Sequence, residues 1–288
     1  MSWRELGRAF VRARPGLLFV AALVNVGAVF VQSMRWRALL RPLAAVGRGE
    51  AFGALAAGFA FSALLPARLG EVARIERISR ESGLKRASVA GSVVLDHTVN
   101  GIAFAPVLAL VGLWPGSPAW ARSAADVLLV LAVGSLAAAV LFATRSAPLP
   151  RRRWLARKLD ELRAGLAAAR NLRPFVQAVA WGVLSWGFEA LTVWVTLAAF
   201  HLPATGLTAL ILLAAVSVAL AAPAPPGNVG TFEIAAVLAL SGLGVPRADA
   251  LAFALGYHAL QIGSVWLVVL LLWGRGAAKG SERSQRAE

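Results

Sequence analysis

Two interrupted apolar stretches decide the fold: LLPARLGEVAR at residues 64–74 and PAPPGNVGTFE at residues 223–233. Each places proline, glycine and a carboxylate within sequence that is otherwise apolar enough for membrane helix. Non-helical backbone and charge are costly at membrane depth unless they are buried in protein or line a wet cavity. Two interruptions at corresponding positions therefore predict a site of the kind that transporters build from broken helices.

The composition predicts a polytopic membrane protein. The chain is 59% hydrophobic and only 15% charged, with a mean hydropathy of +0.70, values that exclude an ordinary soluble domain. We expect an all-α fold with one integral membrane domain over 1–275 and a polar cytoplasmic tail over 276–288. The expected spans are 16–34, 87–113, 124–143, 174–200 and 249–273, and the shorter blocks 51–66 and 207–245 hold the interruptions.

The basic excess indicates membrane topology rather than nucleic-acid binding. The net charge is +15, but the basic residues gather in short loops between apolar segments, as the positive-inside rule describes. The chain has no cysteine, and its three histidines lack the spacing of metal ligands, so no metal or cofactor is expected. The N-terminal stretch has no signal-peptide cleavage pattern, which favours a bacterial-type inner (cytoplasmic) membrane.

Loop charge predicts the orientation of the spans. The loops 68–86 and 145–173 are rich in arginine, whereas the loop 201–208 has no charged residue. The rich loops and the C-terminus are therefore expected in the cytoplasm, and the poor ones outside. This divides the chain into halves of about 1–143 and 174–273, joined by the basic segment 144–173. Four arginines before residue 16 leave the side of the N-terminus open.

The same orientation makes the two interrupted blocks re-entrant. Both flanks of 51–66 are expected in the cytoplasm and both flanks of 207–245 outside, so each block must dip into the membrane and return. Two broken hairpins that enter from opposite sides are what an inverted-topology repeat would produce.

Four motifs resemble a known family. They are MRWRALLRPL (34–43), LLPARLGEVARI (64–75), PPGNVGTFE (225–233) and GYHAL (256–260). In this order and spacing they are similar to the lysylphosphatidylglycerol synthase transmembrane-region family, over about Trp3 to Trp273. The resemblance implies a flippase-like integral membrane protein that moves an amphipathic lipid between leaflets.

The chain departs from the family pattern in three ways. Family members usually have one more helix before the segment that matches Trp3–Pro42. They usually carry an acidic–basic pair followed by Asp where this chain has Asp96, His97 and Asn100, which weakens any role carried over to that helix. No synthetase domain follows residue 273, so a stand-alone member without lysyl transfer is expected.

The first interruption supplies a candidate headgroup site. Arg68, Glu71 and Arg74 are spaced three apart and share one helix face, where two guanidinium groups suit a phosphate and Glu71 can fix them. Pro66 and Gly70 break the helix at this point and expose a helix N-terminus, which favours anions. The alternative is that both arginines are ordinary positive-inside anchors that Glu71 neutralises.

The second interruption ends in a carboxylate without a charged neighbour nearby in the sequence. Glu233 is therefore expected to be protonated or matched from another segment, or else to cap a helix after Gly230. The prolines forbid continuation of the incoming helix, and the glycines allow a positive φ or close approach of the backbone. The residues of this structural motif are Pro225, Pro226, Gly227, Asn228 and Gly230.

Three further polar groups lie inside expected spans. Ser185, Glu189, Thr192 and Thr196 share one helix face, and this predicts either a polar cavity wall with a proton-coupling role or interhelical hydrogen bonding. Two other candidates for a functional role are the pair Asp96 and Asn100, one turn apart, and the single residue His258. Asp96 could instead form an ion pair with a cytoplasmic basic residue, and His258 could instead be a packing residue.

The function these features favour is translocation of an amphipathic lipid, expected to carry an anionic headgroup. Two alternatives stay open: a non-transporting partner of a lipid-modifying or glycosyltransferase enzyme, and a membrane-embedded lipid-modifying enzyme. No catalytic signature is found, so the protein is not expected to be an enzyme. The expected partners are the bilayer, a lipid substrate, and either a second copy of the chain or a lipid-modifying enzyme.

Overall fold

The computed structural model describes residues 3–65, 69–115, 117, 119–144, 153–220 and 225–285. All regular elements within these ranges are helices, as the sequence predicts. Five of them are long and apolar enough to cross a membrane, and each coincides with an expected span. They are α2 (Pro15–Leu40), α5 (Arg86–Leu113), α6 (Ala119–Thr144), α8 (Leu172–Ala199) and α11 (Arg247–Gln285).

The helix α2 continues six residues beyond the expected end at residue 34. The expectation treated Arg35 and Arg37 as the start of a cytoplasmic loop. In the structure Arg35 is buried and paired, and the side chain of Arg37 donates to the Val46 carbonyl at 2.7 Å. Because both charges find partners inside the protein, they do not end the helix.

Each interruption lies between the two helices of a hairpin, but the first hairpin extends beyond the expected block 51–66, because its second helix forms within the expected loop 68–86. The first consists of α3 (Arg48–Leu64) and α4 (Gly70–Ser82), and Arg77 Nη1 donates to the Gly53 carbonyl across it at 3.1 Å. A Cβ at Gly70 would overlap the Gly58 carbonyl oxygen, so glycine permits this close packing. The second hairpin consists of α9 (Gly206–Ala219), the short 3-10 turn η3 (Pro226–Asn228) and α10 (Thr231–Gly242).

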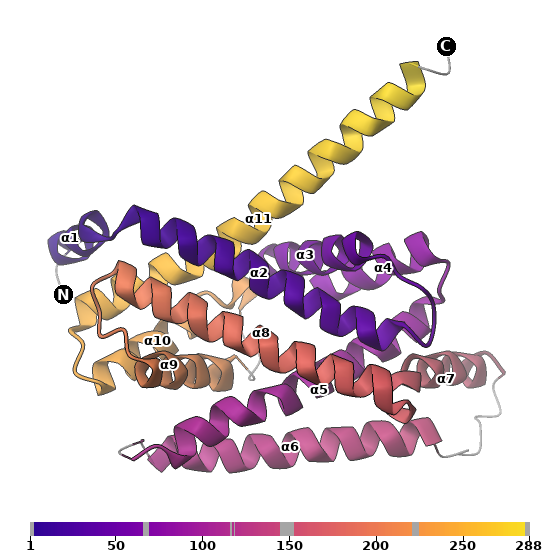
Figure 1. The fold of residues 1–288 in the computed structure, drawn as a ribbon, viewed down its shortest axis with the longest axis horizontal. Coiled ribbons are helices and arrows are strands. Elements are labelled where there is room, and N and C mark those ends of the chain that lie inside the picture. Colours follow the sequence, from indigo (N-terminus) through magenta and orange to yellow (C-terminus); the bar gives the residue numbers. More distant parts are fainter. Residues whose placement is uncertain are drawn as a thin grey trace.

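The hairpins open toward opposite ends of the helix bundle (Figure 1). At one end, the Arg14 amide donates to the Ala199 carbonyl at 2.9 Å, which places the short α1 (Trp3–Arg12) beside the connection into α9. At the other end, Arg41 donates to Gln177 at 2.8 Å, beside the connection into α3. The N-terminal helix therefore lies at the end that also holds the 201–205 connection, and the side of the membrane on which this end lies stays a prediction.

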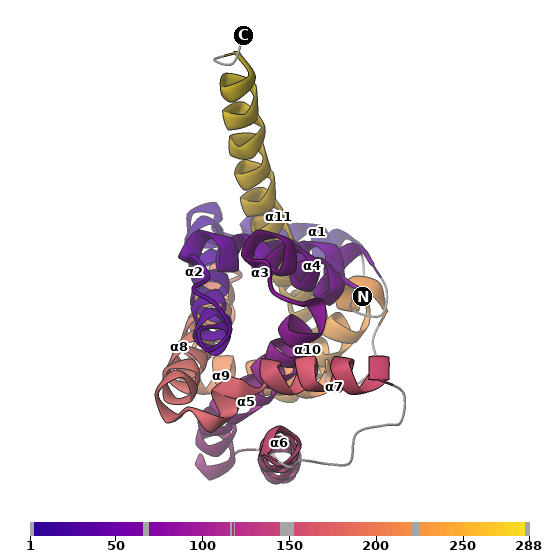
Figure 2. The same ribbon diagram turned by 90° about the vertical axis from the view of Figure 1, so that its right-hand side faces the viewer.

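The order of elements repeats with inverted direction. A long helix, two short helices and a long helix form α2–α5, and the same order recurs in α8–α11. The first helix of each set, α2 and α8, packs antiparallel against the other. Along the chain, the two sets are separated by α6, α7 (Arg153–Gly165) and the 3-10 turn η2 (Ala167–Arg170). In space, α6 lies at the outer edge of the bundle (Figure 2). The C-terminal part of α11 projects away from the other helices (Figure 1).

Candidate functional site

The tips of the two hairpins meet inside the bundle. Gly227 in η3 packs so closely against Ala63 that a Cβ would lie 2.8 Å from the Ala63 carbonyl oxygen. Gly227 and Gly230 have φ values of +64° and +85°, and Asn228 has +58°, so the chain turns sharply after Pro225 and Pro226. The sequence prediction of positive φ at both glycines is confirmed. Pro66 and Arg68 lie outside the described residues.

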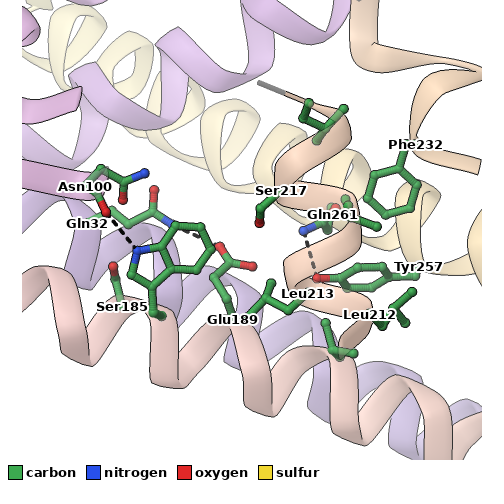
Figure 3. Close-up of a pocket in the computed structure, with 14 residues that line it drawn as sticks. Gln32, Asn100, Ser185, Glu189, Leu212, Leu213, Ser217, Phe232, Tyr257 and Gln261 are labelled. Carbon is green, nitrogen blue, oxygen red and sulfur yellow. Dashed lines mark hydrogen bonds between the residues drawn. The ribbon is translucent and has the colours of Figure 1, made fainter. Parts of the chain in front are cut away.

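Two adjoining cavities lie beside this contact. They measure about 200 Å³ and about 360 Å³, and Gln32, Glu189 and Gln261 line both (Figure 3). The first also has polar groups from α5, α8, α9 and α11: Asn100, Ser185, Ser217 and Tyr257. The second reaches the hairpin tips and includes Ser62, Ala63, Gly227, Asn228 and His258. Polar groups inside a mostly apolar helix bundle are typical of a binding site.

Glu189 is the charged residue of the first cavity. Its Oε1 accepts a hydrogen bond from Gln32 Nε2 at 2.9 Å, and the described lining of this cavity contains no basic side chain. Of the four residues that were expected to form a polar helix face, only Ser185 and Glu189 line this cavity. Ser185 reaches the cavity, whereas Thr192 and Thr196 are buried and donate to backbone carbonyls one turn back. A lone carboxylate in such a cavity suits a cationic group or a proton.

Glu233 is matched from another segment and also caps its own helix. One carboxylate oxygen contacts His258 Nδ1 at 2.6 Å, and the other accepts from the Gly230 amide at 2.6 Å. Phe232 stacks on the His258 ring with 4.5 Å between the ring centroids. Glu233 is therefore matched by His258 and caps α10, while its role in function stays a prediction, and His258 brings this pair to the wall of the second cavity.

A separate ion-pair network ties the first hairpin to α2 and α5. Asp96 accepts from Arg35 Nε at 2.7 Å and from Arg74 Nη1 at 3.3 Å. Arg35 also donates to Asn100, and Arg74 also donates to Glu71. The Arg74 guanidinium lies 4.8 Å from the centre of the Trp36 ring, a cation–π contact.

The charges of the network balance, and the network reaches the first cavity through Asn100. Arg74 and Asp96 are 2% and 1% exposed, and the two arginines face two carboxylates. Neither Arg35 nor Arg74 lines either cavity. Asp96 pairs with basic residues, as the structural alternative held. Binding of phosphate by Arg74 stays a prediction, and it requires these ion pairs to open.

Comparison with known proteins places the chain in a family. The family model described as the lysylphosphatidylglycerol synthase TM region matches residues 1–271. The chain belongs to this family. It is a multi-pass membrane protein whose resemblance in four motifs is confirmed over nearly the whole length. No curated protein and no solved structure gives a significant match.

In this lysylphosphatidylglycerol synthase transmembrane-region protein, sequence reasoning missed three site residues. Arg35 was expected to lie in the cytoplasmic flank of the block 51–66, because Arg37 and Arg41 follow it closely and such a cluster is typical of an exposed loop. Nothing in this local pattern indicated that Arg35 is buried. Gln32 is an uncharged residue in an apolar span, and His97 was considered only beside Asp96. His97 contacts Glu71 at 3.3 Å. A signal did exist for it: Glu71 precedes His97 by 26 residues and Glu233 precedes His258 by 25, so each hairpin carboxylate pairs with a histidine of the next long helix.

Proposed function

We propose that the protein moves an amphipathic lipid between the leaflets of a bacterial-type inner membrane. The observation that carries the proposal is the meeting of two oppositely directed broken hairpins beside polar cavities. Membrane transporters place substrate sites at the interface of inverted repeats, where broken helices supply polar groups. The headgroup would occupy these cavities while the acyl chains stay in the bilayer.

The cavity chemistry favours a headgroup with a cationic or hydrogen-bond-donating part. Glu189 offers a carboxylate that accepts a hydrogen bond from the Gln32 amide, and Gln261 and Tyr257 add neutral polar groups. Among the described residues, Arg35 and Arg74 are held by Asp96 and Glu71 and are not free to bind an anionic headgroup. We therefore propose that Glu189 faces the positive part of a zwitterionic or aminoacylated lipid, or carries a proton in exchange.

Loop charge gives the proposed orientation. The end that holds the connections into α3 and α5 and the segment 153–173 would face the cytoplasm together with the C-terminus. The end that holds α1 and the connection into α9 would face outward. The first hairpin would then be approached from the cytoplasmic leaflet and the second from the outer leaflet.

A liposome assay tests the proposal. Purified protein is reconstituted with acyl-labelled phosphatidylglycerol, phosphatidylethanolamine or aminoacyl-phosphatidylglycerol, and exposure of the label to an impermeant quencher is followed. We expect faster exposure of at least one of these lipids than in protein-free vesicles, and a rate at least about tenfold lower for Glu189→Gln, a loss of roughly 1.4 kcal/mol. Glu161→Gln in α7 is the matched control and should retain the rate. Unchanged exposure with all three lipids in the presence of wild-type protein would refute the proposal.

The Glu233–His258 pair favours a second candidate function. A carboxylate and an imidazole at 2.6 Å, one of them lining a cavity, are an arrangement that general acid–base enzymes use. A membrane-embedded enzyme that alters a lipid headgroup would leave a product of changed mass. Mass spectrometry of the lipids recovered from the same vesicles separates the two functions, because translocation leaves every lipid mass unchanged.

A further inference from the structure

The short helix α1 carries three arginines at intervals of four residues. Arg4, Arg8 and Arg12 therefore follow one side of the helix, and Glu5 is the single acidic residue of α1. Like charges four residues apart destabilise a helix, so one carboxylate leaves an excess of two positive charges on this short segment. Such a row of arginines is favourable where an external anion balances it.

Arg8 and Arg12 border an open groove of about 850 Å³ that is separate from the central cavities. The groove lies between α1, the connection into α9 and the start of α11, and its charged or titratable lining is Arg8, Arg12, His201, Arg247 and Asp249. The three arginines are exposed, and none forms an ion pair with an acidic side chain that the structure describes. Asp249 offsets only one of their charges.

The backbone around the groove is held in a defined shape. His201 has a φ of +57°, an uncommon value for a residue other than glycine, and its Nε2 contacts the Arg12 carbonyl oxygen at 3.1 Å. Phe10 packs edge-on against Phe200 with 5.8 Å between the ring centroids. These contacts fix α1 against the bundle and set the position of Arg12 relative to His201.

Topology does not account for these arginines. The groove lies at the end of the bundle opposite the arginine-rich loops, where the positive-inside rule disfavours basic residues. Beside the arginines, Phe10 and Val11 are 41% and 88% exposed. A basic helix with exposed apolar side chains is typical of a segment that lies in the membrane interface.

We propose that this groove binds the phosphate of an anionic phospholipid in the leaflet at that end of the molecule. Arg8, Arg12 and Arg247 would donate to the phosphate oxygens, which guanidinium groups contact in a bidentate manner. The glycerol and upper acyl chain would lie along Phe10 and Val11. The exposed apolar neighbours favour a lipid over free phosphate, and the site does not depend on whether the protein transports lipid.

Binding is measured on the full chain in a neutral detergent by native mass spectrometry. The probes are phosphatidylglycerol, zwitterionic phosphatidylcholine and inorganic phosphate. We expect the wild type to retain phosphatidylglycerol in preference to phosphatidylcholine. The combined Arg8→Gln, Arg12→Gln and Arg247→Gln variant should bind phosphatidylglycerol at least about tenfold more weakly, because three charge-assisted contacts are lost.

The matched control is Arg48→Gln combined with Arg170→Gln and Arg173→Gln, which removes the same charge from the opposite end. It should keep the wild-type affinity for phosphatidylglycerol. An equal loss in this control would show a general charge effect and overturn the proposal. Wild-type affinity in the groove variant would overturn it as well, and competition by millimolar inorganic phosphate would assign the groove to a soluble anion instead of a lipid. Equal melting temperatures of the two variants exclude misfolding as the cause.

Discussion

The α3–α4 and α9–α10 hairpins share one plan but are held in place by different chemistry. In each, a glycine opens the second helix, a glutamate follows within three residues, and that glutamate contacts a histidine of the next long helix. The first hairpin adds a buried network of Arg35, Arg74 and Asp96, whereas the second relies on Glu233, His258 and the backbone of Gly230. The first hairpin is therefore held by several buried ion pairs, and the second by one carboxylate–imidazole contact and by backbone packing.

This difference matters for movement. Opening the first hairpin separates charges that are almost fully buried, which is costly without water or a replacement partner. Opening the second breaks one carboxylate–imidazole contact, between Glu233 and His258. If transport requires a hairpin to move, the structure favours the α9–α10 hairpin as the element that moves and the α3–α4 hairpin as the fixed one.

The largest effect is expected when the shared carboxylate of the first hairpin is removed. Asp96→Asn leaves Arg35 and Arg74 buried without their common partner, and breaking a buried ion pair costs about 3–5 kcal/mol. The variant should melt far below the wild type in detergent or lose its monodisperse state. Asp160→Asn, which removes a carboxylate that is 55% exposed and paired with Arg163, should melt within a degree or two of wild type, by comparison with surface pairs worth about 0–1 kcal/mol. Equal melting temperatures of Asp96→Asn and the wild type would contradict the inference that buried ion pairs hold the first hairpin in place.

The opening glycines should respond to alanine for different reasons. At Gly70 a Cβ would overlap the Gly58 carbonyl oxygen, so Gly70→Ala must separate α3 from α4, at a cost of about 1–3 kcal/mol. At Gly230 no atom lies within 4 Å, but the φ of +85° with a ψ of −52° disfavours alanine by about 1–3 kcal/mol. We expect Gly70→Ala to have the lower melting temperature, because its Cβ would lie only 1.9 Å from a backbone oxygen. The reverse order would mean that backbone strain at the second hairpin outweighs packing at the first.

The sequence predicted the plan of the two hairpins better than their contacts. Proline, glycine and loop charge sufficed to place the breaks and their opposite directions, because helix interruption and orientation are local properties. The pairing of Arg35 with Asp96 depends on three-dimensional contact across 61 residues, and no local pattern encodes it. Glu189 was found because a carboxylate in an apolar span stands out, whereas its partner Gln32 is uncharged and gave no comparable signal.

The two hairpin glutamates should separate stability from transport. Glu233→Gln loses the ion pair with His258 but keeps a group that can accept from Gly230, so we expect near wild-type melting and transport at least about tenfold slower, roughly 1.4 kcal/mol. Glu71→Gln should lower the melting temperature, because the charge of Arg74 is then less balanced. Both variants are compared in the liposome assay at equal reconstitution. Normal transport by Glu233→Gln would show that the Glu233–His258 contact does not control movement of the second hairpin.

The smallest effect is expected at the surface of the first hairpin. Arg86 and Arg80 lower the pKa of Glu76 to about 2 from its usual 4.5. A carboxyl group with a lowered pKa stabilises the fold above the unfolded value, and this contribution is lost as the pH falls from about 4.5 toward 2. Glu76→Gln should therefore reduce the melting temperature slightly at pH 7 and leave transport unchanged. The difference in melting temperature between Glu76→Gln and the wild type should become smaller as the pH is lowered from about 4.5 toward 2. If Glu76→Gln lowered the melting temperature at pH 7 as much as Asp96→Asn does, the first hairpin would be stabilised mainly by its surface ion pairs and not by the buried network.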